Sequence, residues 1–314
     1  MSVTAEPALP EVLPPGTLPS TIPTTATRVC TLATLGDSTP VGLGDPAPGG
    51  GWRGFPVLLR DALGATELVN PARTGARMSW VRHEQLPSTL AASPQVAVLF
   101  VGMNDTLRSD FDPAAMRADC AATVDALRAA GAHVLMLRYH DHTRVFRLPA
   151  PLRRALRRRI DALNAVTDAV AAGRAGVGVL DLDRIPGGYD RASWAVDRLH
   201  PSELGHRMLA AGFAALLADA GFAVPHPVDL RCGGGRRVGA AHRAAWLVVK
   251  GVPWLARRSR DLGPVIVQGL VDELRRTRTG DRGASRRPAA PAPPARPGPP
   301  PRAGSAPRPL RRPA

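Results

Sequence analysis

Residues 28–38 read RVCTLATLGDS, and this stretch decides the fold class. The apolar run over residues 28–35 predicts a buried strand. It ends in Gly36-Asp37-Ser38, so a hydroxyl stands where the chain leaves the predicted sheet. If a helix follows, its N-terminal amides surround that oxygen and favour developing negative charge. Gly-Asp-Ser is also a common turn, so this stretch alone does not establish a site.

On the C-terminal side of this strand, short apolar runs alternate with amphipathic ones. We expect further strands over residues 67–70, 95–101, 132–138 and 177–182, and helices over residues 51–63, 113–130, 151–172 and 203–220. Asp112 is the expected N-cap of the second of these helices, and Gly131 follows its end. This alternation favours a parallel sheet with helices on both faces, in which functional groups gather at the carboxyl ends of the strands.

Two further motifs stand where such groups would gather. Residues 102–105 read GMND after a predicted strand, and the Asn104 amide is the kind of neutral donor that stabilises an oxyanion. Residues 197–201 read DRLHP just before the last predicted helix. There Asp197 stands three residues before His200, close enough in a bent loop to fix the tautomer of its ring. Each motif alone is equally typical of a surface turn.

Taken in chain order, the motifs resemble those of the SGNH hydrolase family, also called GDSL-type esterases. The family's four marks are matched by GDS at 36–38, by Gly75 after the second strand, by GMND at 102–105 and by DRLHP at 197–201. The resemblance covers about residues 28–222. It implies a three-layer α/β/α sandwich with a five-stranded parallel sheet in the flavodoxin-like order 2-1-3-4-5.

Carried over by position, the resemblance also implies a role for each matching residue. Ser38 would be the nucleophile and His200 its base, with Asp197 orienting the ring. The backbone N–H groups of Ser38 and Gly75 and the side-chain amide of Asn104 would hold the oxyanion, although Gly75 is equally a turn glycine. The implied reaction is acyl transfer through an acyl-enzyme, with no cofactor and no metal.

Other polar residues near the predicted site have more than one interpretation. Asp105 is expected to organise its loop rather than take part in the chemistry. The run His140-Asp141-His142 suggests a metal, but neighbouring side chains in a loop rarely converge, so we expect it to shape the substrate pocket. Arg73 and Arg77 either meet an anionic substrate or form structural ion pairs. The remaining candidates are Trp52, Trp80 and Trp194, for the pocket or the core, and His83, His133 and His206, for the surface or packing.

The formal net charge of +15 is confined to one end of the chain. Residues 1–230 carry 22 arginines and 22 acidic residues, whereas residues 231–314 carry 19 basic and 4 acidic residues. Proline-rich composition without a periodic apolar face predicts disorder over residues 1–27 and 280–314. The predicted domains are therefore a disordered tail (1–27), the hydrolase domain (28–222), a basic amphipathic helical extension (223–279) and a disordered Pro/Arg-rich tail (280–314).

The sequence thus predicts a serine ester hydrolase acting on a small-molecule ester, which includes acyl esters, lysophospholipids and carbohydrate esters. Two alternatives remain: an acyltransferase with the same triad, and a peripheral adaptor whose residues 231–314 bind an anionic partner such as a membrane surface. The Pro/Arg-rich tail has no aromatic residue for base stacking, which disfavours nucleic acid.

Several features bound the cellular setting. Cys30, Cys120 and Cys232 stand too far apart to indicate a disulfide framework or a zinc site. A signal-peptide pattern and an apolar stretch of membrane-spanning length are both lacking, so we expect a cytoplasmic protein, with the membrane periphery as an alternative. Nothing in the sequence predicts the oligomeric state.

Overall fold

The computed structural model describes residues 26–145, 148–233, 235, 267 and 271. In this part of the chain five strands form one parallel sheet in the order β2-β1-β3-β4-β5. The strands are β1 (Thr31–Gly36), β2 (Glu67–Val69), β3 (Val96–Phe100), β4 (His133–Arg138) and β5 (Val177–Asp181). This order confirms the one that the family resemblance implied.

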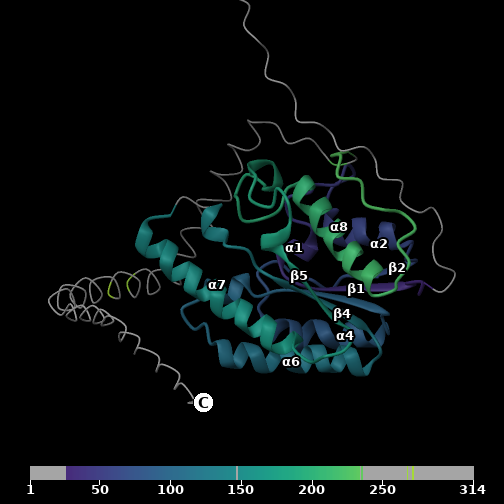
Figure 1. Cartoon of the computed structure of the whole chain (residues 1–314), viewed down its shortest axis with the longest axis horizontal. Helices are drawn as coiled ribbons and strands as arrows, with labels where there is room; N and C mark the ends of the chain where they lie inside the picture. Colours follow the sequence, from purple (N-terminus) through teal and green to yellow (C-terminus); the bar gives the residue numbers. More distant parts are fainter. Residues whose placement is uncertain (1–25, 146–147, 234, 236–266, 268–270, 272–314) are drawn as a thin grey trace, which may run out of the picture. The chain divides into compact units, whose positions relative to one another are not determined.

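The longer helices form the two outer layers of the sandwich (Figure 1). Helices α2 (Gly54–Leu63) and α8 (Glu203–Asp219) pack against each other on one face of the sheet. The other face is covered by α4 (Leu86–Ala91), α6 (Pro113–Ala129) and α7 (Ala150–Ala171). The three-layer α/β/α prediction is therefore confirmed.

Short elements follow the strand ends and line the functional edge of the sheet. They are α1 (Ser38–Val41), α5 (Met103–Thr106) and the 3-10 turns η2 (His142–Arg144), η3 (Leu182–Arg184) and η4 (Arg191–Ser193). Helix α3 (Met78–Trp80) and the π-helical turn η1 (Val81–Gln85) lead into α4. A loop or short helical turn follows each strand here, so the rigid sheet positions the polar groups that these loops carry.

The core explains why β1 and β3 read as continuous apolar runs. Both strands are buried on both faces because helices cover the two sides of the sheet. Phe55 of α2 fills the space under the sheet, with ring centroids 5.4 Å from Phe213 of α8 and 5.7 Å from Phe100 of β3. All three aromatic rings are buried. Packing of this kind fixes the α2–α8 layer beneath the strand ends that carry the site.

The element bounds differ from the predictions in two informative places. Helix α2 begins at Gly54 rather than at residue 51, because the backbone N–H and the side chain of Arg53 are engaged with Asp45 (3.0 and 2.9 Å). The helical stretch over residues 78–91 was not predicted, since a π-helical turn and Pro87 break its apolar period. Elsewhere the agreement is close, and the Asp112 carboxylate caps α6 as expected.

The folded unit extends beyond both predicted domain bounds. Thr27 pairs with Phe222, and residues 223–233 contain no helix although a helical extension was predicted to begin at residue 223. This coil is held to α2 and α8: His226 N–H donates to Ala62, and Gly233 N–H donates to the Glu203 carboxylate at 2.6 Å. The helical extension is thus corrected over these eleven positions, because their backbone is bonded to the domain instead of to itself.

Apart from residues 26, 27, 267 and 271, the predicted tails and the predicted helices beyond residue 235 fall outside the described residues. Among the helices that the structure does describe, none combines the length and the apolar character needed to cross a bilayer.

Candidate active site

The predicted site residues converge at the carboxyl edge of the sheet. The strand order reverses between β1 and β3, which makes their adjoining ends the topological switch point of the fold. Ser38 follows β1 and Asn104 follows β3, while the loop before α8 brings Asp197 and His200 to the same edge. Residues far apart in sequence are thus gathered by the order of the strands.

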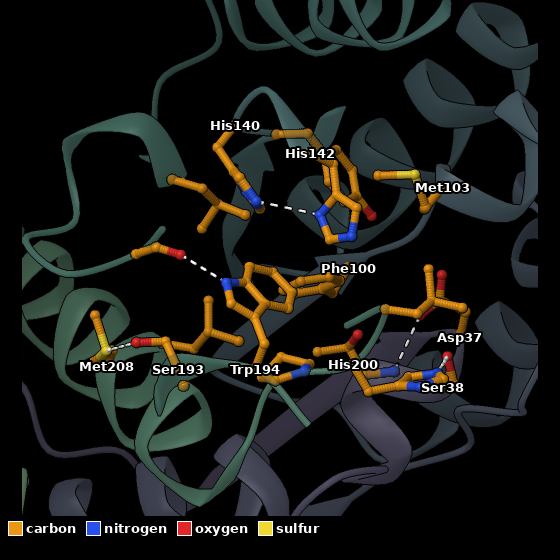
Figure 2. Close-up of a pocket in the computed structure, with 18 of the residues that line it drawn as sticks. Asp37, Ser38, Phe100, Met103, His140, His142, Ser193, Trp194, His200 and Met208 are labelled. Carbon is orange, nitrogen blue, oxygen red and sulfur yellow. Dashed lines mark hydrogen bonds between the residues drawn. The ribbon is translucent and has the colours of Figure 1, made fainter. Parts of the chain in front are cut away.

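Ser38, His200 and Asp197 form a continuous hydrogen-bonded series. The His200 Nε2 atom lies 2.8 Å from Ser38 Oγ, which Figure 2 shows as a dashed line. The other ring nitrogen, Nδ1, lies 2.6 Å from Asp197 Oδ2. Since a carboxylate only accepts, His200 carries its proton on Nδ1 and presents the Nε2 lone pair to the serine hydroxyl.

The Asp197 carboxylate is held as an anion in a mostly buried position. Its Oδ1 atom accepts from the backbone N–H groups of Leu199 (2.9 Å) and His200 (3.0 Å). Burial raises the pKa of this carboxyl, but the hydrogen bonds and charge of His200 and these two amides outweigh it, and the net pKa lies below its usual value. The same carboxylate therefore shapes the loop and orients the ring.

The turn that carries Ser38 requires its glycine. Gly36 has φ +146°, and a Cβ there would lie 1.9 Å from the Phe100 carbonyl oxygen of the neighbouring strand. Asp37 caps the following turn, because its Oδ1 accepts from Thr39 N–H at 3.1 Å. Helix α1 has only four residues, so the amides of a single turn surround Ser38 rather than those of a long helix.

The Asn104 side chain is oriented by the neighbouring residues. Its Nδ2 group donates to Asp37 Oδ2 (3.2 Å) and to the Ala76 carbonyl (3.3 Å), so the amide nitrogen faces the Ser38 side of the site. Complete burial raises the pKa of Asp37 to about 6, although the Thr39 amide, the charge of His200 and the Asn104 amide act in the opposite direction. Asp37 thus connects the loop after β1 to the loop after β3.

Gly75 precedes Ala76, the residue that accepts from Asn104, and it does not line the apolar cavity beside Ser38. It is exposed, has φ +83°, and stands in a loop that Arg73 N–H ties to the Gly36 carbonyl at 3.1 Å. The adjacent residue, Ala76, accepts the hydrogen bond from Asn104. The positive φ accounts for a glycine at this position whether or not its N–H takes part in chemistry.

Asp105 holds the loop after β3 in place. Its carboxylate accepts from Met78 N–H (3.2 Å) and pairs with Arg77 Nε (3.3 Å), while Arg77 also pairs with Asp110 (3.0 Å). This geometry agrees with the loop-organising role predicted for Asp105. It also places Arg77 in structural ion pairs.

An apolar cavity opens beside Ser38 and encloses about 790 Å³, counting the part open to solvent. Figure 2 shows Ser38 and His200 at one end, Met208 and Ser193 at the other, and Trp194 between them. The apolar side chains on its wall are Phe100, Met103, Leu107, Leu182, Ile185, Trp194, Leu199, Met208 and Leu209. The Ser38 hydroxyl therefore faces a largely apolar space.

Two histidines belong to this wall, as the sequence predicted for the 140–142 loop. His140 and His142 are both buried, and their rings lie 5.2 and 4.8 Å from the Trp194 ring. Burial lowers the pKa of His140 to about 4 and that of His142 to about 3. Within the part of the chain that the structure describes, no cluster of His, Cys, Asp and Glu side chains is arranged to hold a metal ion.

The other residues for which the sequence left two interpretations do not line the cavity. Trp52 and Trp80 are exposed, and the Arg73 guanidinium stacks on the Trp80 ring at 4.9 Å. His206 is fully buried, where its Nδ1 accepts from Phe55 N–H at 3.1 Å, so it is a packing residue. His83 is exposed, and His133 packs half-buried against Phe222.

Comparison with known families decides the assignment. Residues 34–208, more than half of the chain, match the model of the GDSL-like Lipase/Acylhydrolase family. The chain belongs to this family. It is therefore a carboxylic ester hydrolase of the GDSL type.

Several solved structures are similar to this GDSL hydrolase. A variant of an acetyl-xylooligosaccharide esterase from Geobacillus stearothermophilus is 17% identical with a TM-score of 0.50, covering 62% of this chain and 96% of its own. Phospholipase A1 from Streptomyces albidoflavus is 20% identical with a TM-score of 0.46, covering 61% and 99%. A G-D-S-L lipolytic protein from Desulfitobacterium hafniense is 16% identical with a TM-score of 0.49, covering 59% and 98%. No curated protein matches the sequence.

One residue that sequence reasoning missed supports the turn that carries Ser38 in this GDSL hydrolase. Gln85, at the end of η1, is buried and pairs with both backbone groups of Gly36: its Oε1 accepts from the N–H at 2.8 Å and its Nε2 donates to the carbonyl at 2.9 Å. The contact spans 49 positions of sequence. No local pattern signals it, because a glutamine in an amphipathic stretch usually faces solvent.

Replacing Gln85 with leucine should destabilise the fold measurably. The Gly36 carbonyl would still accept from Arg73 N–H, but the Gly36 N–H would be left buried without a partner. We expect the free energy of unfolding, measured by urea denaturation, to fall by about 1–3 kcal/mol.

Gln95→Leu provides a matched control. The Gln95 side-chain oxygen Oε1 accepts from Cys30 and Thr31 N–H at the other end of β1, but this side chain is exposed, so water replaces it. An equal loss of stability in both variants would contradict the burial argument.

Proposed function

We propose that this enzyme hydrolyses carboxylic esters of apolar acyl groups through an acyl-enzyme on Ser38. The observation that carries the proposal is the position of Ser38 Oγ, 2.8 Å from His200 Nε2 at one end of an apolar cavity. A nucleophile, a base oriented by a carboxylate and a space for the acyl group are thus within reach of one another.

In the first half of the reaction, His200 Nε2 takes the Ser38 proton while Oγ attacks the ester carbonyl carbon. The imidazolium that forms is stabilised by the Asp197 carboxylate 2.6 Å from Nδ1. Collapse of the tetrahedral intermediate breaks the bond to the alcohol oxygen, which takes the proton from His200. The alcohol leaves and the acyl group stays on Ser38.

The oxyanion of that intermediate needs donors on the side of Ser38 away from His200. We assign the Ser38 backbone N–H, the Gly75 backbone N–H and Asn104 Nδ2 to this role. Asn104 Nδ2 already points toward this part of the site, because it donates to Asp37 and Ala76. On binding substrate it would redirect one of these two weak hydrogen bonds to the oxyanion, as expected for a site that tightens in the transition state.

In the second half, water replaces the alcohol. His200 Nε2 takes a proton from the water as its oxygen attacks the acyl carbon, and the proton then returns to Ser38 Oγ as the acid leaves. An alcohol in place of water would give acyl transfer, so the nature of the acceptor distinguishes hydrolase from acyltransferase.

Two polar groups on the cavity wall favour an apolar acyl chain over a sugar. Trp194 Nε1 donates to the Gly188 carbonyl at 2.9 Å, and Ser193 Oγ donates to the Gly187 carbonyl at 2.8 Å. Because these donors already have protein partners, they offer little to the hydroxyl groups of a carbohydrate. Among the predicted substrate classes, an ester with an apolar acyl chain therefore fits this wall best.

The expected result is a preference for acyl chains that fill the cavity. Across a series of p-nitrophenyl esters, kcat/KM should rise from acetate to a medium-length chain and then level off. Met208 lies at the end away from Ser38 (Figure 2), so Met208→Trp should shorten the cavity and lower the ratio of kcat/KM for the longer to the acetyl ester by about 10-fold or more.

Met208→Leu conserves volume and should keep the wild-type ratio. A profile that is flat across chain lengths, or the same in Met208→Trp as in the wild type, would place the acyl group outside this cavity. Absence of any ester hydrolysis by the wild type would refute the proposed function itself.

A further inference from the structure

Two buried histidines on the cavity wall have no part in the mechanism above. His140 and His142 follow β4 and are 4% and 3% exposed. Figure 2 shows a dashed line between their rings, and His142 is also in contact with the loop that carries Asp197 and His200. Burying two imidazoles in an apolar wall is costly unless each is hydrogen-bonded, which makes the direction of their hydrogen bonds informative.

The hydrogen bonds can run in only one direction. His142 Nε2 lies 3.0 Å from the Arg198 carbonyl oxygen, and a carbonyl only accepts, so this nitrogen carries the proton. The low pKa of His142 keeps the ring neutral, and its Nδ1 is then an acceptor. His140 Nε2, 3.2 Å from that Nδ1, must donate to it. The series therefore runs from His140 to His142 to the Arg198 carbonyl.

The accepting carbonyl belongs to the strained residue of the catalytic loop. Arg198 has φ +54°, a left-handed conformation that a residue with a side chain adopts only where its surroundings impose it. Its N–H donates to the Ala195 carbonyl at 3.0 Å, and His142 holds its carbonyl. Arg198 lies in the chain between Asp197 and His200, whose side chains meet at 2.6 Å.

The histidine pair is itself held from several sides. The Asp141 carboxylate caps η2 by accepting from Thr143 N–H at 3.1 Å, and it pairs with Arg157 of α7 at 2.9 Å. Asp141 N–H donates to the Tyr189 hydroxyl at 3.1 Å. Together with the Trp194 ring, these contacts leave the two imidazoles little freedom, so His142 presents a fixed donor to the loop.

We propose that His142, oriented by His140, is a positioning residue that fixes the Arg198 peptide and through it the alignment of Asp197 and His200 on Ser38. This inference rests on the proposed function, since it concerns the same site. It assigns no contact with the reacting atoms to His142. The competing explanation is that both histidines only form part of the cavity wall.

The two explanations predict different kinetics. A wall residue changes how well an acyl chain fits, so its loss alters KM and the preference among chain lengths. A positioning residue changes the alignment of the base, so its loss lowers kcat by the same factor for every ester. Misalignment on the order of 1 Å costs about 100-fold in rate, so we expect a loss of about 10- to 100-fold.

The test compares variants at position 142 in the full-length enzyme. His142→Phe keeps a flat ring but removes the donor, and His142→Met removes it with a smaller, flexible side chain in case the phenyl variant does not fold. Both should lower kcat about 10- to 100-fold on acetyl and longer p-nitrophenyl esters alike. His142→Gln, which has one acceptor and one donor at similar reach, should restore kcat to within about 5-fold of the wild type.

His133→Phe is the matched control. This histidine begins β4, the strand that His140 and His142 follow, and its ring packs against Phe222. It should keep the wild-type kcat. A wild-type kcat in His142→Phe or His142→Met, a change confined to KM, or a His142→Gln variant as slow as His142→Phe would overturn the proposal.

A readout that needs no turnover separates this proposal from the proposed function. The short Asp197–His200 hydrogen bond should give a far-downfield proton NMR signal that disappears in His200→Ala. In His142→Phe the signal should shift or broaden, and in His142→Gln it should stay in place. An unchanged signal in His142→Phe would contradict the positioning role even if no ester were hydrolysed.

Discussion

Ser38→Ala should lower kcat for a p-nitrophenyl ester by about 10⁵- to 10⁶-fold, because members of a serine triad act as a unit. Its hydroxyl is the proposed acceptor of the acyl group, and no other hydroxyl in the site is bonded to His200 within the described residues. The residual rate would come from the oxyanion donors and from binding alone. The fold should be kept, since the substitution removes one hydroxyl from an already packed turn.

Covalent labelling gives the second measurement. A fluorophosphonate probe should label the wild type and spare Ser38→Ala, with mass spectrometry of a proteolytic digest placing the adduct on the peptide that contains residue 38. Ser79→Ala is a suitable control, because Ser79 is an exposed serine in α3 outside the cavity. Equal labelling of Ser38→Ala and the wild type would remove Ser38 from the role of nucleophile.

The central strands could be predicted because they are buried on both faces. A strand covered by helices on both sides needs apolar residues at successive positions, and this requirement leaves a continuous signature in the stretches that became β1 and β3. The stretch before α4 left no such signature, since its helix is interrupted by a π-helical turn. The start of α2 was displaced by the ion pair between Arg53 and Asp45, a contact that depends on the folded loop.

The site residues could be predicted where they lie in short sequence motifs. Asp197 and His200 are three residues apart and meet within one loop, so local spacing contains the information. Gln85 and His142 form hydrogen bonds with backbone groups of residues 49 and 56 positions away. Every residue offers a backbone carbonyl, so the sequence does not indicate which one is bonded. Their partners can therefore be found only from the fold.

The same limit explains the error at the end of the domain. Residues 223–233 were predicted to belong to a basic helical extension, together with the residues that follow them. Their backbone is nevertheless engaged by Glu203 and Arg207 of α8, with the Arg207 guanidinium donating to the Asp229 carbonyl at 2.6 Å. Charged side chains on a helix read as a solvated face until the segment that covers them is known.

His200→Ala should lower kcat to the same extent as Ser38→Ala, about 10⁵- to 10⁶-fold, because a serine hydroxyl without a base is a weak nucleophile. The loss should appear in kcat more than in KM, since the ring contributes little surface to the apolar wall. Fluorophosphonate labelling of Ser38 should slow in parallel. Circular dichroism and Tm should show that the fold is kept.

The double variant Ser38→Ala/His200→Ala provides the sharper test of this pairing. If His200 acts only by activating Ser38, its loss should have no further effect in an enzyme that already lacks the Ser38 hydroxyl. The double variant should then be no slower than either single variant. The 2.8 Å contact between Oγ and Nε2 predicts this full non-additivity. Losses that multiply would instead mean that the two residues act in separate steps, and the hydrogen bond between them would then be structural rather than the path of the proton.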